Sequence, residues 1–219
     1  MSKTLTLSLG GLGVGGAGVG GLYALKPWES SINTFKEKYP EAILNTAEDS
    51  DSWSSKYNSL KSTKPKHPTL IRTYDEATKK TPATADDTKA KRLMREGCQE
   101  IYQSKIGNPD NFSDFKNYCS KTNKDSSTIS KWNAEEPSTQ QNNKWDKSLN
   151  LLKDHDPSTK GELPEALQRL KASLTGKTSY EQSNRQELKG WCDSVQLEPF
   201  EGKDSSNFKS QELYCKEQA

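Results

Sequence analysis

The longest apolar run in the chain is its N-terminal stretch, residues 4–25, which carries no charged side chain and lies between Lys3 and Lys26. As a helix this stretch would span about 33 Å, close to the roughly 30 Å thickness of the hydrocarbon core of a bilayer. The rest of the chain holds no apolar run of comparable length. The pattern therefore predicts a transmembrane anchor over residues 1–26, with the lipid bilayer as a partner.

Glycines recur along this stretch at four-residue spacing, which places them on one face of a helix. Such a strip lets a second helix pack closely within a membrane. The strip therefore favours self-association of the anchor through Gly11, Gly15, Gly16 and Gly20.

Three other interpretations of residues 4–25 stay open. A cleaved signal peptide would use the small residues of Gly18-Val19-Gly20 as its cleavage site. A flexible tail would leave the stretch without regular structure. A nucleotide-binding loop would use the G-x-G-x-x-G matches, but that fingerprint needs a following helix and a second strand. Because Lys26-Pro27-Trp28 ends the pattern and no apolar second strand follows, the nucleotide loop is the least favoured.

The apolar positions after the anchor have the spacing of a helix. Trp28, Ile32, Phe35 and Tyr39 fall on one helical face, and Pro40 interrupts the pattern. This spacing predicts a stalk helix within residues 27–50.

From Trp53 onward the pattern occurs twice. Trp53, Asn58 and Leu60 are matched in order and spacing by Trp145, Asn150 and Leu152. Further pairs follow in the same order: Gly97-Cys98 with Gly190-Trp191-Cys192, Asn111-Phe112 with Asn207-Phe208, and Tyr118-Cys119 with Tyr214-Cys215. Agreement in order at tryptophan, asparagine, leucine and cysteine positions, and at the final Tyr-Cys pair, predicts a tandem duplication of one module.

Each copy is predicted to form four short helices. In the second copy Leu163, Leu167, Leu170 and Leu174 lie at helical spacing around Pro164. The third helix of each copy is predicted to start at a capping box, which begins at Thr84 in one copy and Thr178 in the other. No segment alternates as a strand does, so the predicted fold class is all-α.

The segment between the copies is rich in Ser, Thr, Asn and Gln and is predicted to be a polar linker. The expected organisation is an anchor or signal over 1–26, a stalk helix over 27–50, a first module over 51–120, a linker over 121–143 and a second module over 144–219.

Composition narrows the functional classes. The chain has 32 basic and 30 acidic side chains, a net charge of +2, which argues against a dedicated nucleic-acid binder. The mean hydropathy is −1.02 and only 30% of residues are hydrophobic, so small cores strengthened by crosslinks are expected.

All four cysteines follow the apolar stretch. They form no C-x-x-C pair and the chain has only two histidines, so no metal site is predicted. An even number of cysteines after an export segment predicts two disulfides, whereas a cytosolic protein would keep four buried thiols. Of the three possible pairings the duplication favours one bridge within each module, Cys98 with Cys119 and Cys192 with Cys215.

No catalytic constellation is recognisable, so neither an enzyme activity nor a cofactor is predicted. His67 precedes Pro68, and His155 lies between Asp154 and Asp156. Both histidines are expected in solvated turns, without the base and orienting group that nucleophilic catalysis needs.

The start Met1-Ser2-Lys3, the Gly/Leu/Val/Ala stretch, Lys26-Pro27-Trp28 and cysteines in aromatic contexts (Gly190-Trp191-Cys192, Tyr214-Cys215) resemble a large paralogous family of short uncharacterised proteins of haemotropic mycoplasmas. The resemblance implies a membrane-anchored or exported surface protein, antigenically variable, whose partner would be a host surface or serum protein. It carries over no catalytic residue.

The expected location is the cell membrane, with a single span and an extracellular body. Lysines after the span, Lys26, Lys36 and Lys38, slightly favour a cytoplasmic body, but the paired cysteines argue for the outside. The alternatives are an exported enzyme or inhibitor, and a nucleotide-binding protein that uses the glycine-rich stretch.

Overall fold

The computed structural model describes residues 33–45, 50–80 and 84–218 of the chain. These residues form helices joined by loops, with isolated β-bridges and no extended strand among them, so the predicted all-α class is confirmed. Among the helices that the structure describes, none is both long and apolar enough to cross a bilayer. The predicted anchor, with Gly11, Gly15, Gly16 and Gly20, lies outside the described residues.

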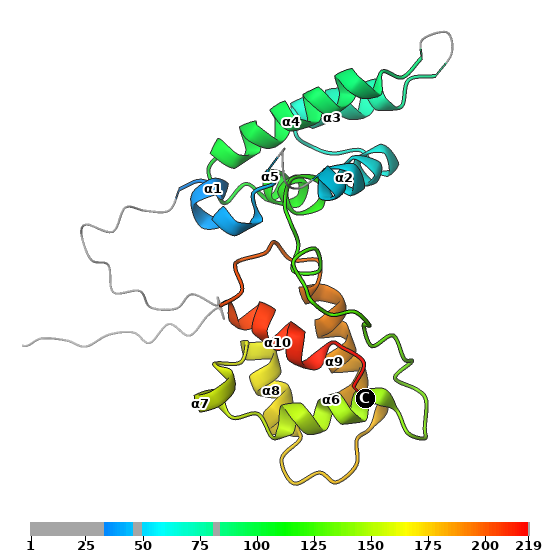
Figure 1. Cartoon of the computed structure of the whole chain (residues 1–219), viewed down its shortest axis with the longest axis vertical. Coiled ribbons are helices and arrows are strands. Elements are labelled where there is room, and N and C mark those ends of the chain that lie inside the picture. Colours follow the sequence, from blue (N-terminus) through cyan, green and yellow to red (C-terminus); the bar gives the residue numbers. More distant parts are fainter. Residues whose placement is uncertain (1–32, 46–49, 81–83, 219) are drawn as a thin grey trace, which may run out of the picture. The chain divides into compact units, whose positions relative to one another are not determined.

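Figure 1 shows the elements in chain order. They are α1 (Phe35–Lys38), η1 (Pro40–Ala42), α2 (Ser50–Ser62), α3 (Pro68–Ala77), α4 (Asp87–Gln103), α5 (Pro109–Asp114), η2 (Phe115–Cys119), α6 (Lys144–Lys153), α7 (Pro157–Lys160), α8 (Glu165–Ser173), α9 (Gln182–Val195) and α10 (Ser206–Tyr214).

Elements α1 to η2 surround a first core. The inner face of α4 carries Met94, Cys98 and Ile101, which are all buried. Helix α3 lies alongside α4 (Figure 1), and Gly97 of α4 allows the close approach. A Cβ atom at Gly97 would come within 2.8 Å of Cδ2 of Leu70 on α3.

The segment predicted as a stalk helix folds differently over its described part. Helix α1 is a single turn, capped by Thr34 and Glu37. It ends before Pro40, because a proline disfavours the helical conformation in the residue that precedes it. Phe35 is 1% exposed and its ring centroid lies 5.0 Å from that of Phe115, within the first core. Residues 33–45 are therefore part of the first module and do not form a separate stalk.

Elements α6 to α10 surround a second core. Leu163, Leu167, Leu170 and Leu174 are buried, as their spacing predicts, although α8 itself begins after Pro164. Trp145 is fully buried, and its indole N–H donates to the carbonyl of Glu135 (2.8 Å). The four leucines and this tryptophan share one core with further buried residues, among them Leu149, Leu152 and Leu188.

Two predicted helix starts are shifted. Helix α4 is capped by Asp86, whose carboxylate accepts from the backbone N–H of Lys89 (2.9 Å), and not by Thr84. Helix α9 is capped by Glu181 and not by Thr178. The hydroxyl of buried Tyr180 donates to Asn150 (2.6 Å), which holds the preceding residues against α6 and outside the helix.

The segment predicted as a linker packs onto the second module. Bridges join Thr122 to Pro199 and Trp132 to Lys216. The segment also buries three asparagines, each of which forms a side-chain hydrogen bond with a backbone group: Asn123, Asn133 and Asn143. Its polarity therefore reflects buried hydrogen bonding as well as exposure to solvent.

Candidate functional site

The two predicted disulfides are present. Cys98 of α4 is bonded to Cys119 at the end of η2, with a Cα–Cα distance of 5.3 Å. Cys192 of α9 is bonded to Cys215 after α10, with a Cα–Cα distance of 5.5 Å. Each bridge joins the third predicted helix of a module to its fourth, and all four cysteines are buried. The pairing that the duplication favours is therefore confirmed, while the duplication itself stays a prediction.

Polar contacts fix the backbone beside each bridge. The hydroxyl of Tyr102 donates to the carbonyl of Cys119 (2.6 Å). The backbone N–H of Asn133 donates to the carbonyl of Cys215 (2.9 Å). Each disulfide is thus held inside a hydrogen-bonded frame and belongs to the structural core of its module.

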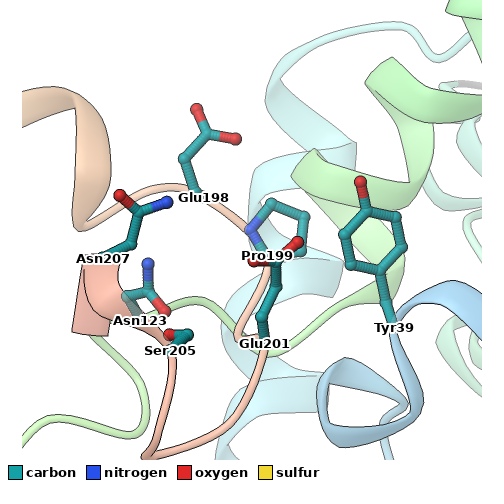
Figure 2. Close-up of a pocket in the computed structure, with 7 residues that line it drawn as sticks. All are labelled: Tyr39, Asn123, Glu198, Pro199, Glu201, Ser205 and Asn207. Atoms are coloured by element: carbon teal, nitrogen blue, oxygen red, sulfur yellow. The ribbon is translucent and has the colours of Figure 1, made fainter. Parts of the chain in front are cut away.

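A polar pocket of about 180 Å³ is the candidate site (Figure 2). Three parts of the chain contribute side chains to it: the turn after α1, the start of the 121–143 segment and the loop that leads into α10. In the view of Figure 2, Asn123, Ser205 and Asn207 lie on one side and Tyr39 on the other. The remaining lining residues are Glu198, Pro199 and Glu201.

Two carboxylates make this pocket acidic. Glu198 pairs with Lys116 of η2 (2.6 Å), whereas Glu201 has no ion-pair partner among the described residues. Burial raises the pKa of the Tyr39 hydroxyl, and the carboxylates of Glu201 and Glu198 raise that pKa further. Tyr39 therefore stays protonated and presents a donor beside two acceptors.

Asn123 adds an acceptor. It is 2% exposed, its side-chain N–H donates to the carbonyl of Val195 (2.9 Å), and its side-chain oxygen has no donor among the described residues. The side-chain oxygen of neighbouring Gln211 is also buried without a donor. An excess of acceptors over donors suits a ligand group that donates hydrogen bonds.

The pocket does not have the arrangement of a nucleophilic site. Ser205 is the only serine among its lining residues. Its hydroxyl oxygen caps α10 by accepting from the N–H of Phe208 (3.2 Å). No histidine lines the pocket. Among the described residues, no group of three or more His, Cys, Asp or Glu side chains could hold a metal ion.

The prediction that His155 lies in a solvated turn is wrong. His155 is 3% exposed, and its Nδ1 is hydrogen-bonded to the hydroxyl of Tyr214. Its Nε2 lies 2.8 Å from the carbonyl of Gly161, which can only accept, so Nε2 is the donor in this hydrogen bond. Lys171 donates to the backbone carbonyl of His155. His155 therefore fastens the loop around α7 to α10, and its flanking aspartates do not form a catalytic cluster with it.

His67 is also tied to the fold. Its backbone N–H donates to Asp114 (2.6 Å), and its Nε2 lies 3.7 Å from a carboxylate oxygen of Glu100. This places the residue between α3 and its neighbours α4 and α5, where it positions the start of α3.

Sequence reasoning missed the residues of the pocket. Tyr39, Asn123 and Glu201 are far apart in the chain, and none belongs to a recognisable motif. The available local signal was a turn: Pro199 and Gly202, which has a φ of +102°, mark the loop before α10. The chain matches no protein-family model, no curated protein and no solved structure.

Proposed function

We propose that this chain is a non-enzymatic, membrane-anchored surface protein whose two disulfide-closed helical modules contact host molecules or are displayed to them. The observation that carries the proposal is the pair of buried disulfides, one within each module. Disulfides of this kind persist outside the reducing cytosol, which supports an extracellular body. The apolar stretch of residues 4–25 and the resemblance to a family of surface proteins support the membrane anchor.

Side chains that carry chemistry in many enzymes have structural partners here. His155 is held by Tyr214 and Gly161, and the guanidinium of Arg185 is held by Asp146. Packing of this kind supports a binding or display role over catalysis, because a catalytic group has to stay available to a substrate. The polar pocket of Figure 2 offers a surface feature through which a partner could be recognised.

The test combines protease treatment of intact cells with mapping of the cysteines under non-reducing conditions. If the body lies on the cell surface, the protease should digest residues 33–218 in intact cells. The mapping should then yield peptides that join Cys98 to Cys119 and Cys192 to Cys215. A cytosolic control protein must survive the same digestion. Two results together would exclude the proposal. The body would resist the protease in intact cells, and all four cysteines would react as free thiols with an alkylating reagent added before lysis.

A further inference from the structure

A second cavity lies between α2 and α4 of the first module, apart from the pocket of Figure 2. It measures about 150 Å³. Helix α2 contributes Trp53 and Ser54 to its lining, and α4 contributes Lys91 and Arg95. The cavity therefore combines a large ring and a hydroxyl with two cationic side chains.

Its donors outnumber its acceptors. The indole N–H of Trp53 is buried and has no acceptor among the described residues. Arg95 has no carboxylate within ion-pair distance in the described part of the chain. Lys91 lies over the ring of Tyr57 (5.4 Å to the centroid) and near the carboxylate of Asp87, which accepts from the Tyr57 hydroxyl. A buried N–H without an acceptor is costly, so the cavity favours a group that accepts hydrogen bonds.

The second module supplies such acceptors at the matching place. The indole N–H of Trp145 donates to the carbonyl of Glu135, and the Glu135 carboxylate accepts from the N–H of Lys144 (3.0 Å). The next residue, Asp146, holds the guanidinium of Arg185 through two hydrogen bonds of 2.6 and 2.8 Å. In the second module the chain itself therefore supplies a backbone carbonyl for the indole and a carboxylate for the cation.

The first module has the same kinds of donor but no counterpart of the Asp146 carboxylate. Ser54 follows Trp53 where Asp146 follows Trp145. Lys91 precedes Cys98 by the same number of residues as Arg185 precedes Cys192. The cations and the indole are thus retained in the first module, while a serine replaces the aspartate.

We propose that this cavity binds a carboxylate group of an acidic side chain from a partner protein. The carboxylate would accept from the Trp53 indole, as the backbone carbonyl of Glu135 does for Trp145. It would also pair with Arg95 and Lys91, as the Asp146 carboxylate pairs with Arg185. The volume of about 150 Å³ accommodates a single side chain and lies below the usual range of pockets for larger ligands. The inference rests on the proposed function in one respect only, namely that the partner protein meets this chain outside the cell.

The test follows the indole N–H signal of Trp53 by NMR in the full-length, oxidised protein. The Trp53→Phe variant identifies that signal among the five tryptophans. The probe is N-acetyl-aspartic acid N-methylamide, and its neutral control is N-acetyl-asparagine N-methylamide. We expect saturable movement of the Trp53 signal with the carboxylate probe, with an affinity of the order of millimolar, and none with the amide.

Three variants sharpen the result. Arg95→Gln should weaken binding about fivefold, as expected for one solvent-accessible ion pair. Arg92→Gln is the matched control, because Arg92 lies on the same helix but pairs with Glu96 (3.1 Å) outside the cavity. Ser54→Asp restores the carboxylate of the second module, so it should fill the cavity and abolish binding of the probe.

Equal movement with both probes, or unchanged binding in Ser54→Asp, would overturn the proposal. Saturation by phosphate or sulfate without saturation by the carboxylate would overturn it as well. These outcomes are separate from those of the cell-surface test, because the titration uses purified oxidised protein and does not depend on where the cell places it.

Discussion

Arg185 and Asp146 form a two-pronged ion pair between α9 and α6, with N–O distances of 2.6 and 2.8 Å. The Arg185 side chain is 7% exposed. Its third nitrogen donates to the carbonyl of Thr139 (2.9 Å) in the segment that precedes α6. One side chain therefore connects two helices of the second module to the polar segment that lies across them.

This relationship predicts a large effect of Arg185→Ala. The substitution leaves Asp146 and two backbone carbonyls without their donor, so the free energy of unfolding should fall by about 3 kcal/mol, the lower end for a broken buried pair. Arg169→Ala is the control, because Arg169 pairs with Glu165 on an exposed surface, where such pairs contribute about 1 kcal/mol or less. Urea denaturation of both variants measures the difference. Equal losses of unfolding free energy in the two variants would mean that burial of the Arg185 pair adds nothing to stability.

Gly97 of α4 and Gly190 of α9 should respond in opposite directions to alanine. A Cβ atom at Gly97 would lie 2.8 Å from Cδ2 and 3.3 Å from the backbone nitrogen of Leu70, so Gly97→Ala forces α3 and α4 apart. Overpacking of this kind costs about 1–3 kcal/mol. Gly190 lies within α9 with nothing within 4 Å of an added Cβ, so Gly190→Ala should stabilise the protein by about 1 kcal/mol through helix propensity. Thermal unfolding of the two variants checks both signs, and a stabilised Gly97→Ala would contradict the close packing of α3 on α4.

Each disulfide should stabilise its own module. The two bridges close loops with sequence separations of 21 and 23 residues, so the chain-entropy model assigns about 3 kcal/mol to each. We expect the paired variants Cys98→Ala with Cys119→Ala, and Cys192→Ala with Cys215→Ala, to lose similar amounts of stability. Denaturant unfolding with and without reductant measures the loss. A variant whose unfolding midpoint is unchanged would show that its bridge does not constrain the unfolded chain as this model requires.

Stability should fall in alkaline solution because of Tyr214. Burial raises the pKa of its hydroxyl to about 12, whereas the phenol of an unfolded chain has a pKa of about 10. Between these values the folded state holds a proton that the unfolded state has lost, so the stabilisation is complete below about pH 10 and declines as pH rises toward 12.

The Tyr214→Phe variant checks this pH dependence. It should be less stable at neutral pH by about 1 kcal/mol, because His155 loses a hydrogen-bond partner. Its stability should nevertheless fall less steeply between pH 10 and 12. Parallel pH profiles for the two proteins, measured by urea denaturation, would contradict the assignment to Tyr214.

The sequence predicts those parts of the fold that a periodic apolar pattern specifies. Leu167 and Leu170 lie on one face of a helix at any plausible register, so their burial follows from spacing alone. The cysteine pairing is predictable because each copy of the pattern contains two cysteines. Helix starts are less predictable, since Asp86 and Thr84 are both good capping residues and local sequence does not choose between them.

Buried polar residues were not predictable. Asn123 and Asn143 lie in a segment with every feature of an exposed linker, and their burial depends on acceptors and donors that folding brings from elsewhere. His155 was misjudged for the same reason, because Tyr214, its partner, is distant in the sequence. The candidate pocket has the same origin, since Tyr39 and Glu201 meet only in the folded chain.

The position of the disulfides limits how far the chain can be stretched. A force that pulls the two ends of the described chain apart passes through each sulfur bridge and bypasses the residues that the bridge encloses. With a sequence separation of 21 residues, the bridge of the first module withholds about 70 Å of extended chain. Elements α5 and η2 lie within this enclosed length and cannot be drawn out. A body exposed to shear would therefore lengthen in short steps and retain a crosslinked remnant of each module.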